Sequence, residues 1–147
     1  MGNRAVITTE DRRIGVYLHW NGGRDSVEPL LAFCKAAGYR CPENDDYGWA
    51  YLCTVAGCFF GSGTSVGIET LENLDTHGDN GVYIIEGWKI IGRENLYDGF
   101  EEQMEYDFGE MLKEYNEKMP KHMQLSPEIL AGVEENHKRE RENDESE

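Results

Sequence analysis

The stretch Val82-Tyr-Ile-Ile-Glu-Gly-Trp-Lys-Ile-Ile-Gly92 decides the fold class of this chain of 147 residues. Two runs rich in β-branched residues flank Glu86 and Gly87, which is the pattern of two strands joined by a tight turn. Gly87 can adopt the positive φ that a two-residue hairpin turn requires. The stretch therefore predicts an antiparallel hairpin, and with it a protein that contains a β-sheet.

Similar strand patterns occur earlier in the chain. Residues 5–9 and 14–20 indicate a second hairpin around the polar residues 10–13. Residues 65–68 indicate a further short strand. Together with the hairpin at residues 82–92, these segments predict an antiparallel sheet of about five strands.

Helical periodicity appears in the remaining segments. Ser26 is placed to cap a helix that extends to residue 37, and the pair Asp45-Asp46 to cap one that extends to residue 60. From Asp98 onward, apolar residues recur every three or four positions, which predicts a long amphipathic helix that Pro120 ends. Ser126 is placed to start a last short helix. The fold class is therefore α+β, with two central helices on one face of the sheet and a long amphipathic C-terminal helix.

Charge divides the chain into parts. The formal net charge is −15, of which residues 1–97 carry −5 and residues 98–147 carry −10. We expect an α+β body at residues 1–97, an acidic C-terminal helical arm packed on it at residues 98–138, and a disordered tail at residues 139–147, where no apolar residue occurs. Such a negative field repels phosphate backbones and anionic lipids, so direct binding of nucleic acid or of a membrane surface is not expected.

The cysteines do not have the spacing of a metal site. Cys34, Cys41, Cys53 and Cys58 are separated by six, eleven and four residues, whereas zinc ligands usually come in two closely spaced pairs. No metal and no cofactor is predicted. Because no apolar leader and no membrane-spanning segment is recognisable, we expect free thiols in a reducing cytoplasm.

The stretch Asn21-Gly-Gly-Arg-Asp-Ser26 follows a predicted strand and precedes a predicted helix. It resembles the Ser-Gly-Gly-x-Asp-Ser signature of the PP-loop ATP pyrophosphatase family, whose glycine turn and helix N-terminus hold pyrophosphate. Gly22, Gly23, Asp25 and Ser26 match the signature, while Asn21 replaces its leading serine. The alternative interpretation is that the two glycines form a turn and that Ser26 caps the helix.

Two aromatic residues and an arginine flank the same loop. A histidine and a tryptophan at the end of a strand can line a pocket for a planar or anionic ligand. Alternatively, Trp20 packs on the following helix and Arg24 pairs with Asp25 or Glu28. No second histidine or neighbouring cysteine completes a hydrolytic dyad, so no catalytic residue is predicted. The candidate ligand loop consists of His19, Trp20, Asn21, Gly22, Gly23, Arg24 and Ser26.

Residues 98–110 contain six carboxylates and no lysine or arginine. On a helix, Asp98, Glu101, Glu102 and Glu105 share one face and form an acidic stripe. Like charges at this spacing repel one another, so helix stability does not explain the pattern. The stripe is either a solvated face that aids solubility or a binding surface for a basic partner, on which carboxylates imitate nucleic-acid phosphates.

Several stretches carry a resemblance to a known group of proteins. They are Met1-Gly-Asn-Arg-Ala-Val-Ile-Thr-Thr9, Ile14-Gly-Val-Tyr-Leu-His-Trp-Asn-Gly-Gly-Arg-Asp-Ser-Val27, Tyr47-Gly-Trp-Ala50, Glu72-Asn-Leu-Asp75, Asn80-Gly-Val-Tyr-Ile-Ile85 and Trp88-Lys-Ile-Ile-Gly-Arg-Glu94. The chain resembles, over roughly residues 1–97, small acidic proteins of phages and mobile elements of Gram-positive bacteria. The group supplies no activity for any residue, and the resemblance implies an accessory gene of a mobile element whose product acts in a bacterial cytoplasm.

Three hypotheses about function remain open. The first is a non-enzymatic accessory protein that binds a basic host protein and inhibits a defence system such as a restriction or CRISPR nuclease. The second is a nucleotide- or phosphate-binding protein that uses the loop at residues 21–26. The third is a structural or assembly partner that docks through the C-terminal helix. The oligomeric state is not predicted.

Overall fold

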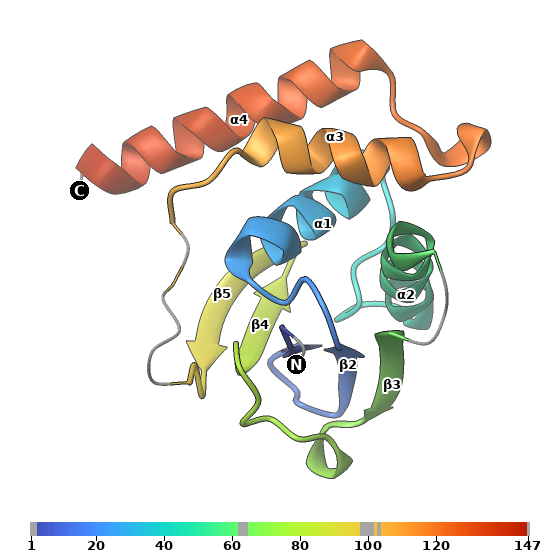
Figure 1. The fold of residues 1–147 in the computed structure, drawn as a ribbon, viewed down its shortest axis with the longest axis vertical. Coiled ribbons are helices and arrows are strands. Elements are labelled where there is room, and N and C mark those ends of the chain that lie inside the picture. The colour runs from blue at the N-terminus through green and yellow to red at the C-terminus, as the bar shows by residue number, and fades with distance from the viewer. Residues whose placement is uncertain (1–2, 62–64, 98–101, 103, 147) are drawn as a thin grey trace.

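The structure is a computed structural model that describes residues 3–61, 65–97, 102 and 104–146. Five strands form one sheet in the order β3-β2-β1-β4-β5 (Figure 1). The strands are β1 (Ala5–Thr8), β2 (Ile14–Leu18), β3 (Val66–Thr70), β4 (Val82–Glu86) and β5 (Lys89–Glu94). The α+β class and the number of strands are therefore as predicted.

Both predicted hairpins are present. β1 pairs with β2 in antiparallel register, and β4 pairs with β5. Glu86 lies opposite Lys89, so the turn residues are Gly87 and Trp88 rather than Glu86 and Gly87. Both turn residues have positive φ, 59° and 62° respectively. A tryptophan rarely adopts this conformation, and its burial in the core compensates the backbone strain.

The sheet is mixed, which corrects the prediction of a purely antiparallel sheet. β1 and β4 run parallel, with Ile7 opposite Tyr83. The two strands start at the same end of the sheet because Asn80 and Gly81, just before β4, hydrogen-bond to the backbone of Arg4 and Val6. This pairing joins segments that are about 75 residues apart, so no local pattern in the sequence indicates it.

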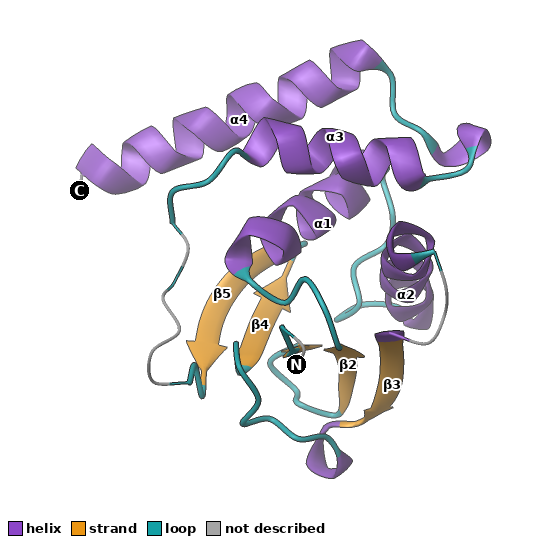
Figure 2. Ribbon diagram, viewed as in Figure 1, coloured by secondary structure: helices purple, strands orange, loops and turns teal. Residues whose placement is uncertain are grey.

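The helices cover one face of the sheet, as Figures 1 and 2 show. Alternate strand residues, among them Ile7, Val16 and Tyr83, belong to the main core beneath these helices. On the opposite face, Val6 and Val82 belong to a smaller apolar cluster, in which the segment after β3 takes part. The helices are α1 (Arg24–Ala36), α2 (Asp46–Phe60), α3 (Phe108–Lys118) and α4 (Pro127–Ser146), with short 3-10 turns η2 (Leu71–Asn73) and η3 (Lys121–Met123).

The predicted helix from Asp98 to Pro120 is shorter in the structure. Asp107 caps α3 by accepting a hydrogen bond from the Glu110 amide at 3.1 Å, so the helix begins at Phe108. Residues 102 and 104–107 are not helical, which agrees with the repulsion expected between their carboxylates. α3 packs on α1 rather than on the sheet and forms a further layer (Figure 1).

α4 is longer than the short helix expected after Ser126. The Ser126 hydroxyl accepts a hydrogen bond from the Ile129 amide at 3.2 Å, as a helix cap does. The helix continues to Ser146, so residues 139–146 are helical where the sequence predicts a disordered tail. Pairs of opposite charge four residues apart, such as Glu135 with Arg139, support a helix without buried apolar residues. No helix in the described part of the chain is long and apolar enough to cross a membrane.

Candidate functional site

The glycine loop is held by contacts within the protein. The Gly22 amide donates to the Asn3 carbonyl at 2.8 Å, and the Gly22 carbonyl accepts from the Tyr83 hydroxyl at 2.7 Å. A Cβ at residue 22 would lie 2.5 Å from the Asn3 oxygen, so glycine is required there by a close approach of two backbones. The positive φ of the loop is instead at Asn21. A phosphate-binding loop would need a free amide at Gly22, but this amide already donates a hydrogen bond to Asn3.

Ser26 is not the N-cap of the first helix. α1 begins at Arg24, its N-cap is Gly23 with φ −72°, and that cap has no side-chain hydrogen bond. Ser26 lies in the first turn and is only 3% exposed. Its hydroxyl accepts from the Asn21 amide group at 3.2 Å and donates to Asp25 at 3.3 Å. The serine thus ties the loop to the first turn, a structural role that differs from the predicted cap.

The aromatic residues before the loop form a separate cluster. His19 Nδ1 lies 2.7 Å from the Tyr17 hydroxyl, and the His19 ring meets Trp20 edge-on with centroids 4.8 Å apart. Trp20 is 43% exposed. Arg24 instead contacts Glu28 at 3.0 Å, as the alternative interpretation predicts. The structure therefore divides the predicted ligand loop into two clusters.

The predicted acidic stripe does not form a helix face. Asp98 and Glu101 lie outside the described residues. Glu102 accepts hydrogen bonds from Arg93 and lies 3.8 Å from Arg24, so its charge is paired. Glu105 is exposed and precedes α3. The prediction of one acidic helix face is therefore wrong for the two described members, because neither Glu102 nor Glu105 lies on a helix.

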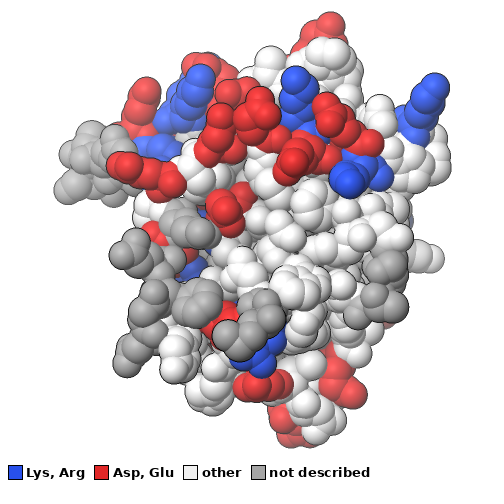
Figure 3. Space-filling model, in the orientation of Figure 1, with Lys and Arg blue, Asp and Glu red and all other residues white. Residues whose placement is uncertain are grey.

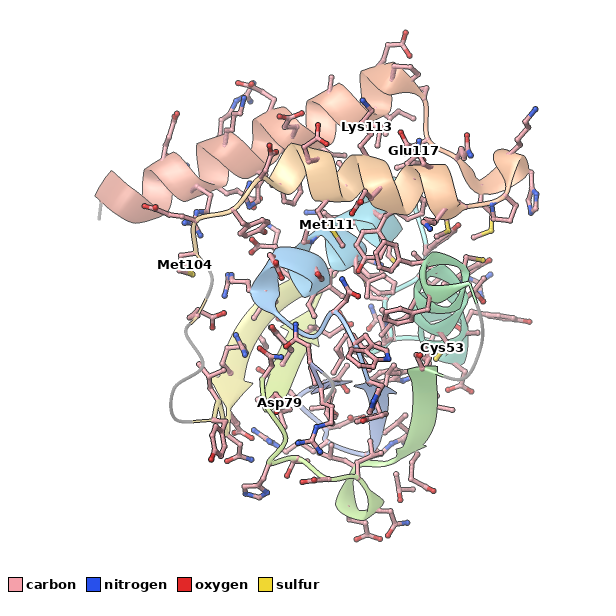
Figure 4. All side chains as sticks on the ribbon, viewed as in Figure 1. Cys53, Asp79, Met104, Met111, Lys113 and Glu117 are labelled. Carbon is pink, nitrogen blue, oxygen red and sulfur yellow. The ribbon has the colours of Figure 1, made fainter. Side chains whose placement is uncertain are left out.

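A different acidic row lies on α3 itself. Glu110, Glu114 and Glu117 are exposed and are spaced by four and three residues, which places them on one face of the helix. Among the residues that the structure describes, none of these carboxylates has a cationic group within 4.0 Å. Figure 4 shows Glu117 with Lys113 on α3, while Met111 lies on the side of α3 towards α1. We refer to these three glutamates as the α3 acidic row.

A groove of about 510 Å³ lies between α1, the start of β5 and α4. We call it the α1–α4 groove. Its apolar lining consists of Leu31, Ala32, Ala36, Trp88, Ile90, Phe108 and Val133. Its polar lining consists of Arg24, Glu28, Lys35, Lys89, Asn136, His137 and Glu140.

Glu28 is the centre of the polar groups in this groove. One of its oxygens accepts from the Tyr106 hydroxyl and lies 3.1 Å from His137 Nε2, while the other lies 3.0 Å from Arg24. Burial by itself would raise the pKa of Glu28, but the hydrogen bonds from His137 and Tyr106 and the charge of Arg24 outweigh burial. The pKa of Glu28 is therefore lowered to about 2, so the carboxylate is ionised at neutral pH.

Two arginines beside this cluster retain unused donors. Arg24 lies between Glu28 and Glu102, and Arg93 contacts Glu102 and lies over the Tyr83 ring at 3.7 Å. The Nε atoms of both arginines are buried, and neither makes a hydrogen bond within the described part of the chain. Buried donors of this kind are usually paired, and these two are exceptions in the described part of the chain.

The groups in the groove do not form a recognisable nucleophile with its base. Burial and the neighbouring Glu28 raise the pKa of the Tyr106 hydroxyl, which keeps it protonated. The Cys34 thiol is fully buried, and burial raises its pKa as well. In the described ranges, no three histidine, cysteine or carboxylate side chains are placed to hold a metal ion.

A second hollow, of about 400 Å³, lies between the β1–β2 turn and the start of α2. Four carboxylates line it together with Arg13: Asp11, Glu43, Asp45 and Asp46. Asp45 caps α2 by accepting from the Tyr47 amide at 2.8 Å, which confirms the predicted cap. One oxygen of Glu43 accepts a hydrogen bond from the Gly87 amide at 2.7 Å, so Glu43 also stabilises the turn between β4 and β5.

Sequence reasoning identified Arg24 and named Glu28 as one of its possible partners, but it missed Tyr106 and His137. Glu28 and His137 are 109 positions apart, and neither stands in a recognisable motif. The only signal was that His137 lies within an otherwise charged helix. Comparisons with protein families, with curated proteins and with solved structures find no match for this chain.

Proposed function

We propose that this protein is a non-enzymatic binding protein whose carboxylates engage the basic surface of a partner protein. The observation that carries the proposal is the α3 acidic row in a protein of net charge −15. In the space-filling view, acidic side chains gather over the helices at the top of the molecule, with lysine and arginine side chains among them (Figure 3). The three glutamates outnumber Lys113 on this face, and an excess of negative charge steers a partner of opposite charge and accelerates association.

The row is presented by a firmly anchored helix. The opposite side of α3 is buried against the core through Phe108, Leu112 and Tyr115. The Tyr115 hydroxyl donates to the Ser26 carbonyl of α1 at 3.0 Å. A partner would therefore meet a surface that needs no rearrangement, which lowers the entropic cost of binding.

The resemblance of residues 1–97 to proteins of mobile elements supports a host protein as the partner. Nucleases of restriction or CRISPR systems carry basic surfaces that contact nucleic-acid phosphates. An acidic row can compete for such a surface, so we propose inhibition of a host defence nuclease as the biological role. The phosphate-binding alternative receives less support, because the Gly22 amide is already engaged.

The test compares two variants of equal net charge. In the first, Glu110, Glu114 and Glu117 are each changed to glutamine. In the second, the exposed residues Glu69, Glu72 and Glu86 are changed in the same way. The binding of each variant to a nona-arginine peptide, and then to a partner captured from a bacterial lysate, is measured at two salt concentrations.

We expect only the first variant to lose affinity, by about tenfold, with a shallower dependence on salt. Equal losses in the two variants would show that net charge alone attracts cations, and the proposal would be wrong. Binding that survives in both variants would direct attention to the acidic hollow around Glu43 and would equally exclude the row.

A further inference from the structure

We propose that the α1–α4 groove binds a small amphipathic organic anion, with an apolar aromatic body and a single carboxylate, sulfonate or phosphate group. The site is separate from the α3 acidic row and favours the opposite charge. The proposal is therefore independent of the proposed protein partner.

The groove has the size and lining of a small-molecule site. Its volume of about 510 Å³ lies within the usual range of roughly 300–1,000 Å³ for such sites. Apolar side chains come from several elements: Ala32 from α1, Ile90 from β5, Phe108 from α3 and Val133 from α4. The apolar part of a ligand bound here would leave water and contact apolar side chains on more than one side.

Trp88 gives the groove a rigid aromatic wall. The residue is 3% exposed, and its indole N–H donates to the Tyr39 carbonyl at 2.9 Å. Its position in the tight turn between β4 and β5 fixes the backbone. On the other side, the rings of Phe108 and His137 stack with centroids 3.8 Å apart. Flat walls that are already in place favour an aromatic ligand.

The charges of the groove favour one anionic group. Both carboxylates of the lining are already paired, Glu28 with Arg24 and His137, and Glu140 with Lys89 at 2.8 Å. Lys35 is exposed and has no ion pair in the described part of the chain, and the Nε of Arg24 is a buried donor without a partner. Among the described residues, an unpaired positive charge thus remains at Lys35, whereas both carboxylates of the lining are paired.

The same carboxylates argue against a polyanion. A triphosphate in this groove would place several negative charges near Glu28 and Glu140. A ligand with one charge can contact Lys35 while its apolar body lies against Trp88. The inferred ligand class is therefore a singly charged aromatic acid rather than a nucleotide.

The probe for the experiment is 8-anilino-1-naphthalenesulfonate, compared with N-phenyl-1-naphthylamine, which has the same rings without the sulfonate. Fluorescence titration of the full chain gives the affinity for each compound. We expect saturable binding of the sulfonate and at least about tenfold weaker binding of the neutral amine. Equal affinities would overturn the requirement for a negative charge.

A matched pair of variants tests the location. Lys35→Glu reverses an exposed charge on the groove, and Lys113→Glu reverses one on α3 that lies outside it. Both variants have the same net charge. We expect Lys35→Glu to weaken binding of the sulfonate about three- to tenfold and Lys113→Glu to leave it nearly unchanged. Equal affinities in the two variants would overturn the proposal.

A third variant tests whether the ligand occupies the α1–α4 groove. Ala32→Trp fills the groove and should abolish saturable binding, provided that its melting transition remains cooperative. Chemical-shift mapping of the wild type with the sulfonate should show the largest changes at Ala32, Lys35, Val133 and the Trp88 indole. Changes centred on another part of the molecule would contradict the assignment even if Ala32→Trp does not fold.

Discussion

The ring of His137 lies parallel to the ring of Phe108, with centroids 3.8 Å apart and planes 4° apart. The same histidine reaches Glu28 on α1, with 3.1 Å between Nε2 and the carboxylate oxygen. One side chain of α4 therefore contacts both α3 and α1. These contacts matter because no described side chain of α4 is fully buried.

The first prediction concerns this contact. His137→Ala removes a stacked ring and a hydrogen bond to an ionised carboxylate, so we expect a loss of about 1–3 kcal/mol in the free energy of unfolding. α4 should also lose protection from amide hydrogen exchange before the rest of the protein does. Lys138→Ala is the control, because Lys138 is exposed and its contact with Glu134, at 3.9 Å, is an exposed ion pair within α4 itself. A His137→Ala variant as stable as this control would show that α4 is held by other contacts.

The second prediction concerns stability in acid. The pKa of Glu28 is lowered from 4.5 to about 2 in the folded protein, so the folded state binds this proton less readily than the unfolded chain does. The resulting stabilisation, on the order of 2–3 kcal/mol, is present above pH 4.5 and is lost as the pH falls towards 2. Urea unfolding at several pH values measures this loss.

The variant Glu28→Gln removes this titration. Its free energy of unfolding should be lower at pH 7 and should change less between pH 5 and pH 2 than that of the wild type. Glu114→Gln, at an exposed position without an ion pair in the described chain, should follow the wild-type pH profile. Parallel profiles for all three proteins would exclude a special role of Glu28.

The third prediction compares two glycines. Gly22→Ala should destabilise the fold by at least about 1–3 kcal/mol, because the new methyl group would meet the Asn3 carbonyl at 2.5 Å. Gly57→Ala should raise the stability by up to about 1 kcal/mol, because this helical position opens onto free space. Thermal and urea denaturation measure whether each variant is less or more stable than the wild type. A harmless Gly22→Ala would mean that the loop does not pack against Asn3.

The fourth prediction concerns the end of α4. Ending the chain at Lys138 removes residues that contribute exposed ion pairs such as Glu140 with Lys89. Helix content by circular dichroism should fall, while the melting temperature should change by less than about 3 °C. Ending the chain at Gln124 also removes Val133 and His137 and should lower the melting temperature far more. Similar melting temperatures for both truncated proteins would show that α4 does not stabilise the body.

Local patterns in the sequence indicated much of the fold. Alternating β-branched residues marked both hairpins, and the cap residues Asp45 and Ser126 marked the starts of two helices. These predictions succeed because strand alternation, tight turns and helix caps depend on neighbours a few residues away. The boundary of α3 was missed, because the apolar spacing continued upstream of the real cap at Asp107.

The candidate sites depended on contacts between distant residues. Arg24 and its neighbour Glu28 could be singled out beside the glycine loop, but the second partner of Arg24, Glu102, lies on a distant segment. Glu102 was predicted to be a solvent-facing charge and instead pairs with Arg93. A carboxylate in an acidic stretch looks the same in the sequence whether it faces water or a buried arginine.

The sequence by itself determined the α+β class, the two hairpins and the acidic character of the surface, because these follow from composition and from short-range periodicity. Only the tertiary structure decided that β1 runs parallel to β4, that α3 packs on α1, and that Glu28, Tyr106 and His137 meet beside an apolar groove. Each of these features joins segments separated by dozens of residues. Their pairing minimises the free energy of the whole chain, in which burial and charge pairing are satisfied together, and no short segment carries that information.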